Sequence, residues 1–408
     1  MMTRLSIFFF PILFWSGGSE QNKISSKAPP QYKMTFEPKN EQKHNENDAP
    51  STLRLMFAGD IMSQLPQIES AFKGMGSYDY TSCFEYIKPI FEQADLVLGN
   101  LECTLSNHPP YTGYPNFISP DQLAEALKKS GFDILVTSNN HALDGGLEGV
   151  NHTIETVKKQ GIMQTGTFLN AAHRKLLYPF IVYKNGFKIA LLNYTHHTNG
   201  YRTTTPAIVN RLVMDEVKKD IIAAKRMKPD VIITFLHWGN EHQLDESSEQ
   251  RGVAQLLHAW GSDLVIGSHP HVVQPIKNES FTINKKQVNY LTAYSLGNFI
   301  SSQPFVNTEG GIVFEVNLKK VKGQVQIDDY FYIPVIRYTP YQQGQMKFYA
   351  LPISPVEGHE NDMKMSESER LKMTKWATQT RTRLNKFGAV EKKFAWQEMM
   401  IGDKGQKY

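Results

Sequence analysis

The chain has 408 residues, of which 40% are hydrophobic and 21% are charged. These proportions are ordinary for a globular protein, and the length allows one large domain or two modest ones. The formal net charge is only +4 and the sequence holds no dense basic patch. The composition therefore gives no support for nucleic acid binding.

The first residues have the pattern of an export signal. Arg4 precedes a short apolar run at 5–15, and small residues follow at 16–19. This order is typical of a secretory signal peptide, and an uncleaved N-terminal anchor is the alternative for residues 1–19. The polar residues 20–50 hold too little apolar surface to fold, which predicts a linker. We therefore expect an exported protein of the periplasm or cell surface, free or anchored to the membrane through its N-terminus.

Short apolar runs alternate with helical patterns through the first half of the chain. The runs that predict strands lie at 53–58, 95–98 and 132–136, and the helical patterns cover about 81–93, 120–130 and 147–160. Such alternation is typical of βαβ units. It predicts an α/β fold whose central, mostly parallel sheets are flanked by helices.

The second half continues this pattern and then changes. Residues 180–183 and 188–193 flank Asn185-Gly186, which indicates a hairpin. Strands are predicted at 230–236 and 263–266, helices at 214–227 and 249–260, and antiparallel strands at 288–294, 311–318 and 326–336. The segment 294–299 reads as a polar turn between strands. We expect one domain at 51–340 and a C-terminal extension at 341–408 with a charged helix over about 360–386.

Two histidines stand one residue apart in the segment Gly267-Ser268-His269-Pro270-His271. Because an apolar run precedes the segment, both imidazoles would leave one loop at the end of a strand. Histidine is the commonest metal ligand, and the proline restricts the backbone before any ion binds. On this motif alone, two ordinary loop histidines remain the alternative.

Metal-ligand residue types also follow the other apolar runs. In chain order they are Asp60, Asn100 with Glu102, Asn140 with His141, His237, and His269 with His271. Singly, each has an ordinary explanation: Asp60 can cap a helix, Asn140 can lie in a turn and His237 can be a core histidine. Together they favour one shared site, because the carboxyl ends of parallel strands meet at one edge of a sheet.

That order resembles the calcineurin-like metallophosphoesterases and, more closely, the bacterial capsule synthesis branch of the CapA/PgsA (poly-gamma-glutamate) type. The phrases that carry the resemblance are Ala58-Gly59-Asp60-Ile61-Met62, Gly99-Asn100-Leu101-Glu102, Ser138-Asn139-Asn140-His141, His237-Trp238-Gly239-Asn240-Glu241, Gly267-Ser268-His269-Pro270-His271 and Ser295-Leu296-Gly297-Asn298-Phe299. They lie within about 53–336. The resemblance implies an α+β sandwich of the metallophosphoesterase type.

The resemblance also implies a site for one or two divalent ions, Mn, Zn or Fe. One ion would be held by Asp60 and His271, and the other by Asn140, His237 and His269. Such a pair of ions activates water and binds the attacking and leaving oxygens of an in-line displacement.

The sequence departs from the superfamily pattern at two positions. Met62 stands where the pattern has a histidine, and a thioether is a poor ligand for Mn or Zn. The bridging aspartate is replaced by Asn100 or Glu102. Of these two, Glu102 is the plausible substitute, because a carboxylate can bridge two cations and compensate their charge.

The same resemblance implies residues that act on the substrate. His141 would be the general acid beside the metal pair. Glu241 is a second candidate catalytic residue, with a surface carboxylate as the alternative. Asn139 and Asn298 are candidate substrate contacts, with ordinary turn residues as the alternative.

These inferences leave alternatives for function. The first is a metal-dependent hydrolase or transferase that acts on an envelope polymer, such as capsule or poly-gamma-glutamate, or on a phosphoester. The second is a non-catalytic subunit of a membrane complex for polymer synthesis and export, and the third is a plain exported phosphodiesterase or nucleotidase. Cys83 and Cys103 are either two buried thiols or a disulfide.

Overall fold

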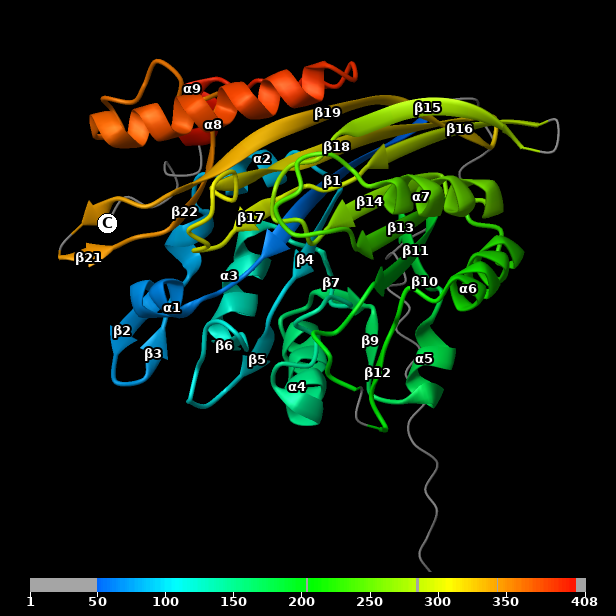
Figure 1. Cartoon of the computed structure of the whole chain (residues 1–408), viewed down its shortest axis with the longest axis horizontal. Coiled ribbons are helices and arrows are strands. Elements are labelled where there is room, and N and C mark those ends of the chain that lie inside the picture. Colours follow the sequence, from blue (N-terminus) through cyan, green and yellow to red (C-terminus); the bar gives the residue numbers. More distant parts are fainter. Residues whose placement is uncertain (1–49, 203–204, 284–285, 343, 401–408) are drawn as a thin grey trace, which may run out of the picture. The chain divides into compact units, whose positions relative to one another are not determined.

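The computed structural model describes residues 50–400, apart from 203–204, 284–285 and 343. The segment predicted at 1–19 and nearly all of the linker predicted at 20–50 lie outside this part. Within it, two β-sheets pack against each other around a shared apolar core, to which Phe57 of one sheet and Ile233 of the other contribute (Figure 1). The predicted α/β fold is therefore confirmed.

The larger sheet has nine strands in the order β22-β19-β18-β1-β4-β7-β8, with β17 beside β1 and β23 beside β19. The strands are β1 Ser51–Ile61, β4 Leu96–Leu101, β7 Ile134–Val136, β8 Met163–Thr165, β17 Asn298–Ile300, β18 Gly310–Val321, β19 Gln324–Tyr338, β22 Tyr349–Pro352 and β23 Val390–Glu391. β1, β4, β7 and β8 run parallel. β18, β19 and β22 pair antiparallel, which confirms the predicted change toward the C-terminus.

The second sheet has six strands in the order β10-β11-β13-β14-β16-β15. The strands are β10 Phe180–Lys184, β11 Phe187–Thr195, β13 Val231–His237, β14 Leu264–Ser268, β15 Ile276–Ile283 and β16 Lys286–Ala293. β11, β13, β14 and β16 run parallel. β10 and β11 form the predicted hairpin around Asn185-Gly186, where both turn residues have positive φ.

Helices cover the outer faces of both sheets. They are α1 Leu65–Ala71, the 3₁₀-helix η1 Thr81–Phe84, α2 Lys88–Phe91, α3 Gln122–Ser130, α4 Gly146–Lys159, α5 Ala171–Leu177, α6 Met214–Arg226, α7 Ser248–Trp260, α8 Glu367–Asn385 and α9 Trp396–Met400. Leu127 of α3 packs in the cluster on β1 and β4, and Leu257 of α7 packs in the cluster on β13. Short strand pairs lie at the periphery: β2 Phe72–Gly74 with β3 Ser77–Tyr78, β5 Thr104–Ser106 with β6 Ile118–Pro120, β9 Thr167–Phe168 with β12 Ile208–Val209, and β20 Tyr341–Gln342 with β21 Gln345–Met346.

Two predicted elements differ from the structure. The helix predicted over 81–93 is divided into η1 and the four-residue α2. Pro89 lies at the start of α2, and a proline begins a helix readily but cannot continue one, because it has no N–H and its ring clashes with the preceding turn. The segment predicted as a turn at 294–299 ends in the strand β17, which pairs parallel to β1.

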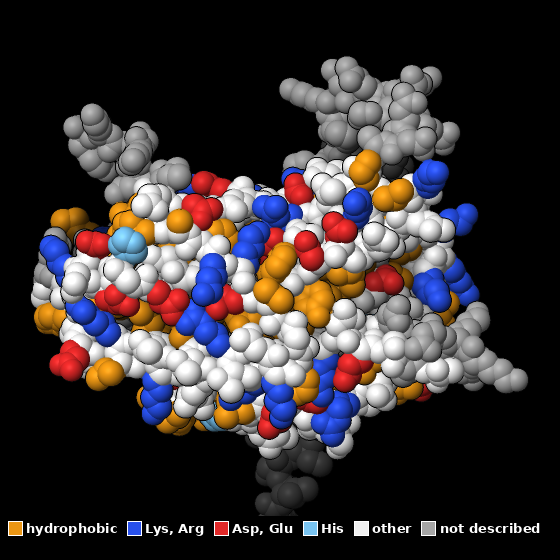
Figure 2. Space-filling model, turned by 90° about the horizontal axis from the view of Figure 1, so that it is seen from above, with side chains coloured by type: hydrophobic (Ala, Val, Ile, Leu, Met, Phe, Trp, Pro, Cys, Tyr) orange, Lys and Arg blue, Asp and Glu red, His pale blue; other side chains and the backbone are white. Residues whose placement is uncertain are grey.

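The C-terminal residues join the larger sheet. β22 and β23 both pair with β19, and α8 packs Met373, Trp376 and Leu384 inward. The outward face of α8 carries the predicted charges, and acidic and basic side chains are interspersed on the surface seen from that side (Figure 2). Cys83 and Cys103 are buried free thiols, the first of the two alternatives. In the part of the chain that the structure describes, no helix has the length and apolar character of a membrane span.

Candidate metal centre

The candidate site lies where strands of both sheets end. Asp60 lies near the end of β1, Asn100 lies opposite it in β4, and His237 ends β13. The segment 139–141 follows β7, and the segment 269–271 follows β14. Parallel pairing aligns the strand ends within each sheet, and the packing of the two sheets brings both sets of ends together. The backbone N–H of residue 269 donates to the Asp60 carboxylate at 3.3 Å across 209 positions of sequence.

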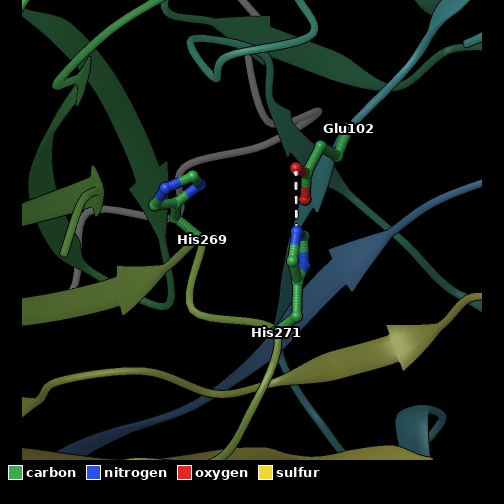
Figure 3. Close-up of side chains that lie close together, drawn as sticks. All are labelled: Glu102, His269 and His271. Atoms are coloured by element: carbon green, nitrogen blue, oxygen red, sulfur yellow. Dashed lines mark ion pairs between the residues drawn. The ribbon is translucent and has the colours of Figure 1, made fainter. Parts of the chain in front are cut away.

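Glu102 lies among the histidines of the site and is fully buried. Neither of its carboxylate oxygens has a hydrogen-bond partner in the described part of the chain. Its Oε1 lies 3.4 Å from Nε2 of His237 and 3.8 Å from Nε2 of His271 (Figure 3). Burial first, and then the charge of Asp60, raises the pKa of Glu102 well above its ordinary value. Two adjacent buried carboxylates cost free energy unless a cation compensates them.

The two ring nitrogens of His237 face different partners. Nδ1 lies 2.9 Å from Ser268 Oγ and 3.2 Å from Asn100 Nδ2. Nε2 lies 2.8 Å from Asn140 Oδ1, 3.1 Å from His269 Nδ1 and 3.4 Å from Glu102 Oε1. Burial and the neighbouring histidines lower the pKa of His237 well below its ordinary value, which keeps the ring neutral, as a metal ligand requires.

These separations match those of ligand atoms around one ion. Atoms about 2.1 Å from an ion lie about 3.0 Å apart at right angles and about 3.4 Å apart at the tetrahedral angle. Two groups of three ligand atoms, each within 4.8 Å of one another, share Glu102: Asp60, Glu102 and His237, and Glu102, His269 and His271. Several potential ligand atoms therefore converge in a buried space. The donor set of imidazoles, carboxylates and an amide therefore fits a divalent ion of the Mn, Zn or Fe type.

The loop that carries His269 and His271 has an unusual backbone. Both residues have positive φ, 99° and 60°, a conformation that side chains with a Cβ rarely adopt and that concentrates at functional sites. Nδ1 of His271 lies 3.1 Å from Asp60 Oδ2 and 3.1 Å from Asn298 Oδ1. These contacts orient the ring so that its Nε2 faces Glu102, as Figure 3 shows.

Asn298 reaches the site through the unexpected strand β17. Its Nδ2 donates to Gln303 Oε1 at 2.8 Å, which turns its Oδ1 toward His271. The half-buried guanidinium of Arg337 donates to two backbone carbonyls of the same loop, at 3.0 and 2.9 Å. Asn298 therefore positions His271 in this structure, and its predicted substrate contact stays a prediction.

Asn139 and Asn100 are engaged with other side chains of the site. Asn139 Nδ2 donates to Asn100 Oδ1 at 3.1 Å, and its Oδ1 accepts the backbone N–H of His141 at 3.1 Å. Asn100 Nδ2 donates to Asp60 Oδ1 at 2.8 Å and lies 3.2 Å from Nδ1 of His237. Of the two residues proposed to replace the bridging aspartate, Glu102 is therefore the one whose oxygens are unengaged.

His141 lies at the edge of this group, buried against Phe117 with ring centroids 4.3 Å apart. Its Nδ1 lies 2.6 Å from Asp144 Oδ2, and the backbone N–H of Phe117 donates to the same oxygen at 2.6 Å. The carboxylate thus fixes the ring and leaves Nε2 for other contacts. Glu241 is exposed. Burial lowers the pKa of the neighbouring His242, and the charge of Glu241 opposes that shift.

Two further histidines lie beside the site and were not singled out from the sequence. The ring of His197 is perpendicular to that of His269, with centroids 4.9 Å apart. The ring of His242 lies 6.3 Å from that of His271 and 4.6 Å from Phe305. The signal for His197 was present, because β11 ends in Thr195 and two histidines follow directly, the pattern seen at the other strand ends.

Comparison with known proteins shows the family. The model of the family described as "Bacterial capsule synthesis protein PGA_cap" matches residues 54–303. The chain belongs to this family. The PGA biosynthesis protein CapA of Bacillus subtilis (strain 168) is 30% identical over 276 residues, and the capsule biosynthesis protein CapA of Bacillus anthracis is 28% identical over 289 residues. The matches cover 66% and 68% of this chain and 68% and 66% of the relatives, so the chain spans about two thirds of their length.

Solved structures similar to the chain include two phosphoesterases. The calcineurin-like phosphoesterase YfkN from Bacillus subtilis is 13% identical, with a TM-score of 0.45, and covers 82% of this chain and 98% of its own. A phosphatase from Mycoplasma pneumoniae is 14% identical, with a TM-score of 0.39, and covers 71% and 95%. At these identities the likeness concerns the fold alone. The resemblance to the capsule synthesis family is confirmed by the family model and the two relatives.

Proposed function

We propose that this member of the capsule synthesis family is a metal-dependent hydrolase or transferase that acts on an envelope polymer or a phosphoester. The observation that carries the proposal is the buried carboxylate of Glu102, which faces His237 and His271 and has no hydrogen-bond partner among the described residues. A purely structural glutamate at full burial would have hydrogen-bond partners. A cation site is the arrangement that makes this one favourable.

The residues that would hold the ions are those of the two groups that share Glu102, with Asn140 beside His237. When bound, such ions supply Lewis acidity and lower the pKa of water. His141 would hold the proton for the leaving oxygen at Nε2, while its Nδ1–H donates to Asp144. The negative charge of Asp144 stabilises the protonated ring and fixes its orientation.

Elemental analysis of the purified chain tests the proposal. We expect stoichiometric Mn, Zn or Fe in the natural protein, and at least tenfold weaker binding in His237→Ala and His269→Ala with circular dichroism unchanged. His152→Ala on α4, whose ring binds Asp121, is the matched control and should retain the metal. Stoichiometric metal in both site variants would remove the assignment of these ligands.

Turnover separates catalysis from metal binding. We expect His141→Ala to keep its metal and to lose hydrolysis of a model phosphodiester by about 10²–10⁴-fold, the usual contribution of general acid–base catalysis. If the natural chain with metal bound hydrolyses the phosphodiester no faster than His141→Ala does, the result would favour a non-catalytic protein, the second candidate below.

The second candidate is a non-catalytic binding or scaffold subunit of a polymer synthesis and export complex. The observation that favours it is Met62, which is buried in the apolar cluster on β1, where the superfamily pattern has a metal-binding histidine. We also propose export to the periplasm or cell surface, based on the pattern at 1–19. Cell fractionation, with and without those residues, tests that proposal.

A further inference from the structure

A loop that the proposed chemistry does not use lies against the metal centre. It covers residues 196–201, directly after β11. The backbone N–H of His196 donates to the His237 carbonyl at 2.9 Å, and the guanidinium of Arg211 donates to the His196 carbonyl and to Thr198 Oγ1, both at 3.1 Å. Asn199 Oδ1 accepts from Asn140 Nδ2 at 3.3 Å. Hydrogen bonds therefore attach the loop to His237 and Asn140 of the site, and Arg211 holds it from outside the site.

His197 is the residue of this loop whose side chain could bind a substrate. Its Nδ1 accepts the backbone N–H of Asn199 at 3.4 Å, so the neutral ring carries its hydrogen on Nε2. Within the described residues, no hydrogen bond engages that Nε2. The ring is partly buried, stands edge-on to His269, and lies within electrostatic range of His141, Glu241 and Arg211.

We propose that the Nε2–H of His197 is a donor to the substrate, and that it holds an anionic oxygen of a phosphoryl or carboxylate group beside Asn140 and His269. This inference rests on the proposed function. A different role for His197, as a metal ligand through Nδ1, is disfavoured because that nitrogen already accepts a backbone N–H. The donor is positioned by the loop before substrate arrives, so little ordering is needed on binding.

The test uses the purified chain with manganese, and inorganic phosphate and γ-glutamylglutamate as separate calorimetric probes. Four proteins are compared: the natural chain, His197→Ala, His197→Gln, whose amide can place an N–H near the original Nε2, and His196→Ala. The last is the matched control, because His196 is the exposed neighbour and its ring faces Glu249. Bound metal is measured on every sample.

We expect His197→Ala to bind at least one probe tenfold or more weakly, which is the scale of one charge-assisted hydrogen bond. His197→Gln should recover part of that affinity, and His196→Ala should match the natural chain. The probe that is affected identifies the anion as phosphoryl or carboxylate. Unchanged binding of both probes, no binding of either by the natural chain, or loss of metal in His197→Ala would each overturn the inference. A natural chain without metal would remove the proposed function first.

Discussion

Glu102→Gln should change stability only when metal is added. Gln keeps the shape of the side chain but cannot ionise, and among the described residues neither carboxylate oxygen of Glu102 has a hydrogen-bond partner. In chelator we expect the two proteins to be equally stable to within about 1 kcal/mol. Burial and the charge of Asp60 raise the pKa of Glu102 and so already disfavour its charged form, and a buried unsatisfied group costs about 1–3 kcal/mol in either protein.

With manganese the two proteins should differ in stability. An ion present at about 100 times its dissociation constant stabilises the folded state by about 2.7 kcal/mol. The natural chain should gain that amount, and Glu102→Gln should gain almost nothing, because both groups of ligand atoms lose their shared carboxylate. Urea unfolding of both proteins, each in chelator and in manganese, measures the four free energies of unfolding.

Glu315→Gln is the matched control. Glu315 is equally buried, but its carboxylate binds Lys392 Nζ at 2.8 and 2.7 Å and lies 3.4 Å from Arg54 Nε. Its variant should lose about 3 kcal/mol in both solutions, as expected for a broken buried ion pair, and should respond to manganese like the natural chain. An equal response of Glu102→Gln to manganese would refute the idea that Glu102 holds the ion.

Three further outcomes follow from the packing. Burial lowers the pKa of His258 to about 4 from 6.5. As the pH falls from 6.5 to 4, only the unfolded chain takes up the proton, so the free energy of unfolding should fall by about 1.4 kcal/mol per pH unit. A plot of the urea midpoint against pH should be flatter for His258→Gln than for the natural chain, and equal slopes would exclude His258 as the source. Arg337→Met should weaken metal binding about tenfold by releasing the loop that orients His271, which a metal titration would show, whereas an unchanged affinity would contradict that role. Gly267→Ala should destabilise by about 3 kcal/mol or more, because its Cβ would lie 1.9 Å from a backbone carbonyl oxygen. Gly252→Ala, at a half-buried position of α7 with open space for a Cβ, should be neutral or stabilising, and similar urea midpoints for the two variants would refute the argument.

The sequence predicted much of the sheet framework because apolar runs and their spacing are local properties. The strands that carry Asp60, Asn100 and His237 lie within a few residues of their predicted positions. The placement of Asn298 could not be predicted, because β17 is short and is a strand only through its pairing with β1. The division of the helix predicted over 81–93 had a local signal, Pro89, that was given too little weight.

The site shows the same division between local and long-range information. The sequence predicted the residue types at the strand ends. They come together because parallel strands of one sheet end at the same edge and the two sheets pack against each other. The side-chain oxygen of Asn100 is engaged and those of Glu102 are not, and this difference depends on hydrogen bonds from Asn100 to Asn139 and Asp60, which lie on other parts of the chain. His197 was readable as a strand-end histidine, but its nearness to His269 was not.

By itself, the sequence determined the alternation of strands and helices and the kinds of side chain that follow each strand. Those properties depend on a few neighbouring residues, whose apolar spacing is set by the geometry of the backbone. Only the tertiary structure decided which ligand atoms converge, which amides are already engaged, and that Glu102 lies between His237 and His271 without a hydrogen-bond partner among the described residues. These features depend on the register between strands far apart in the chain, and a contact across two hundred residues has no local signature.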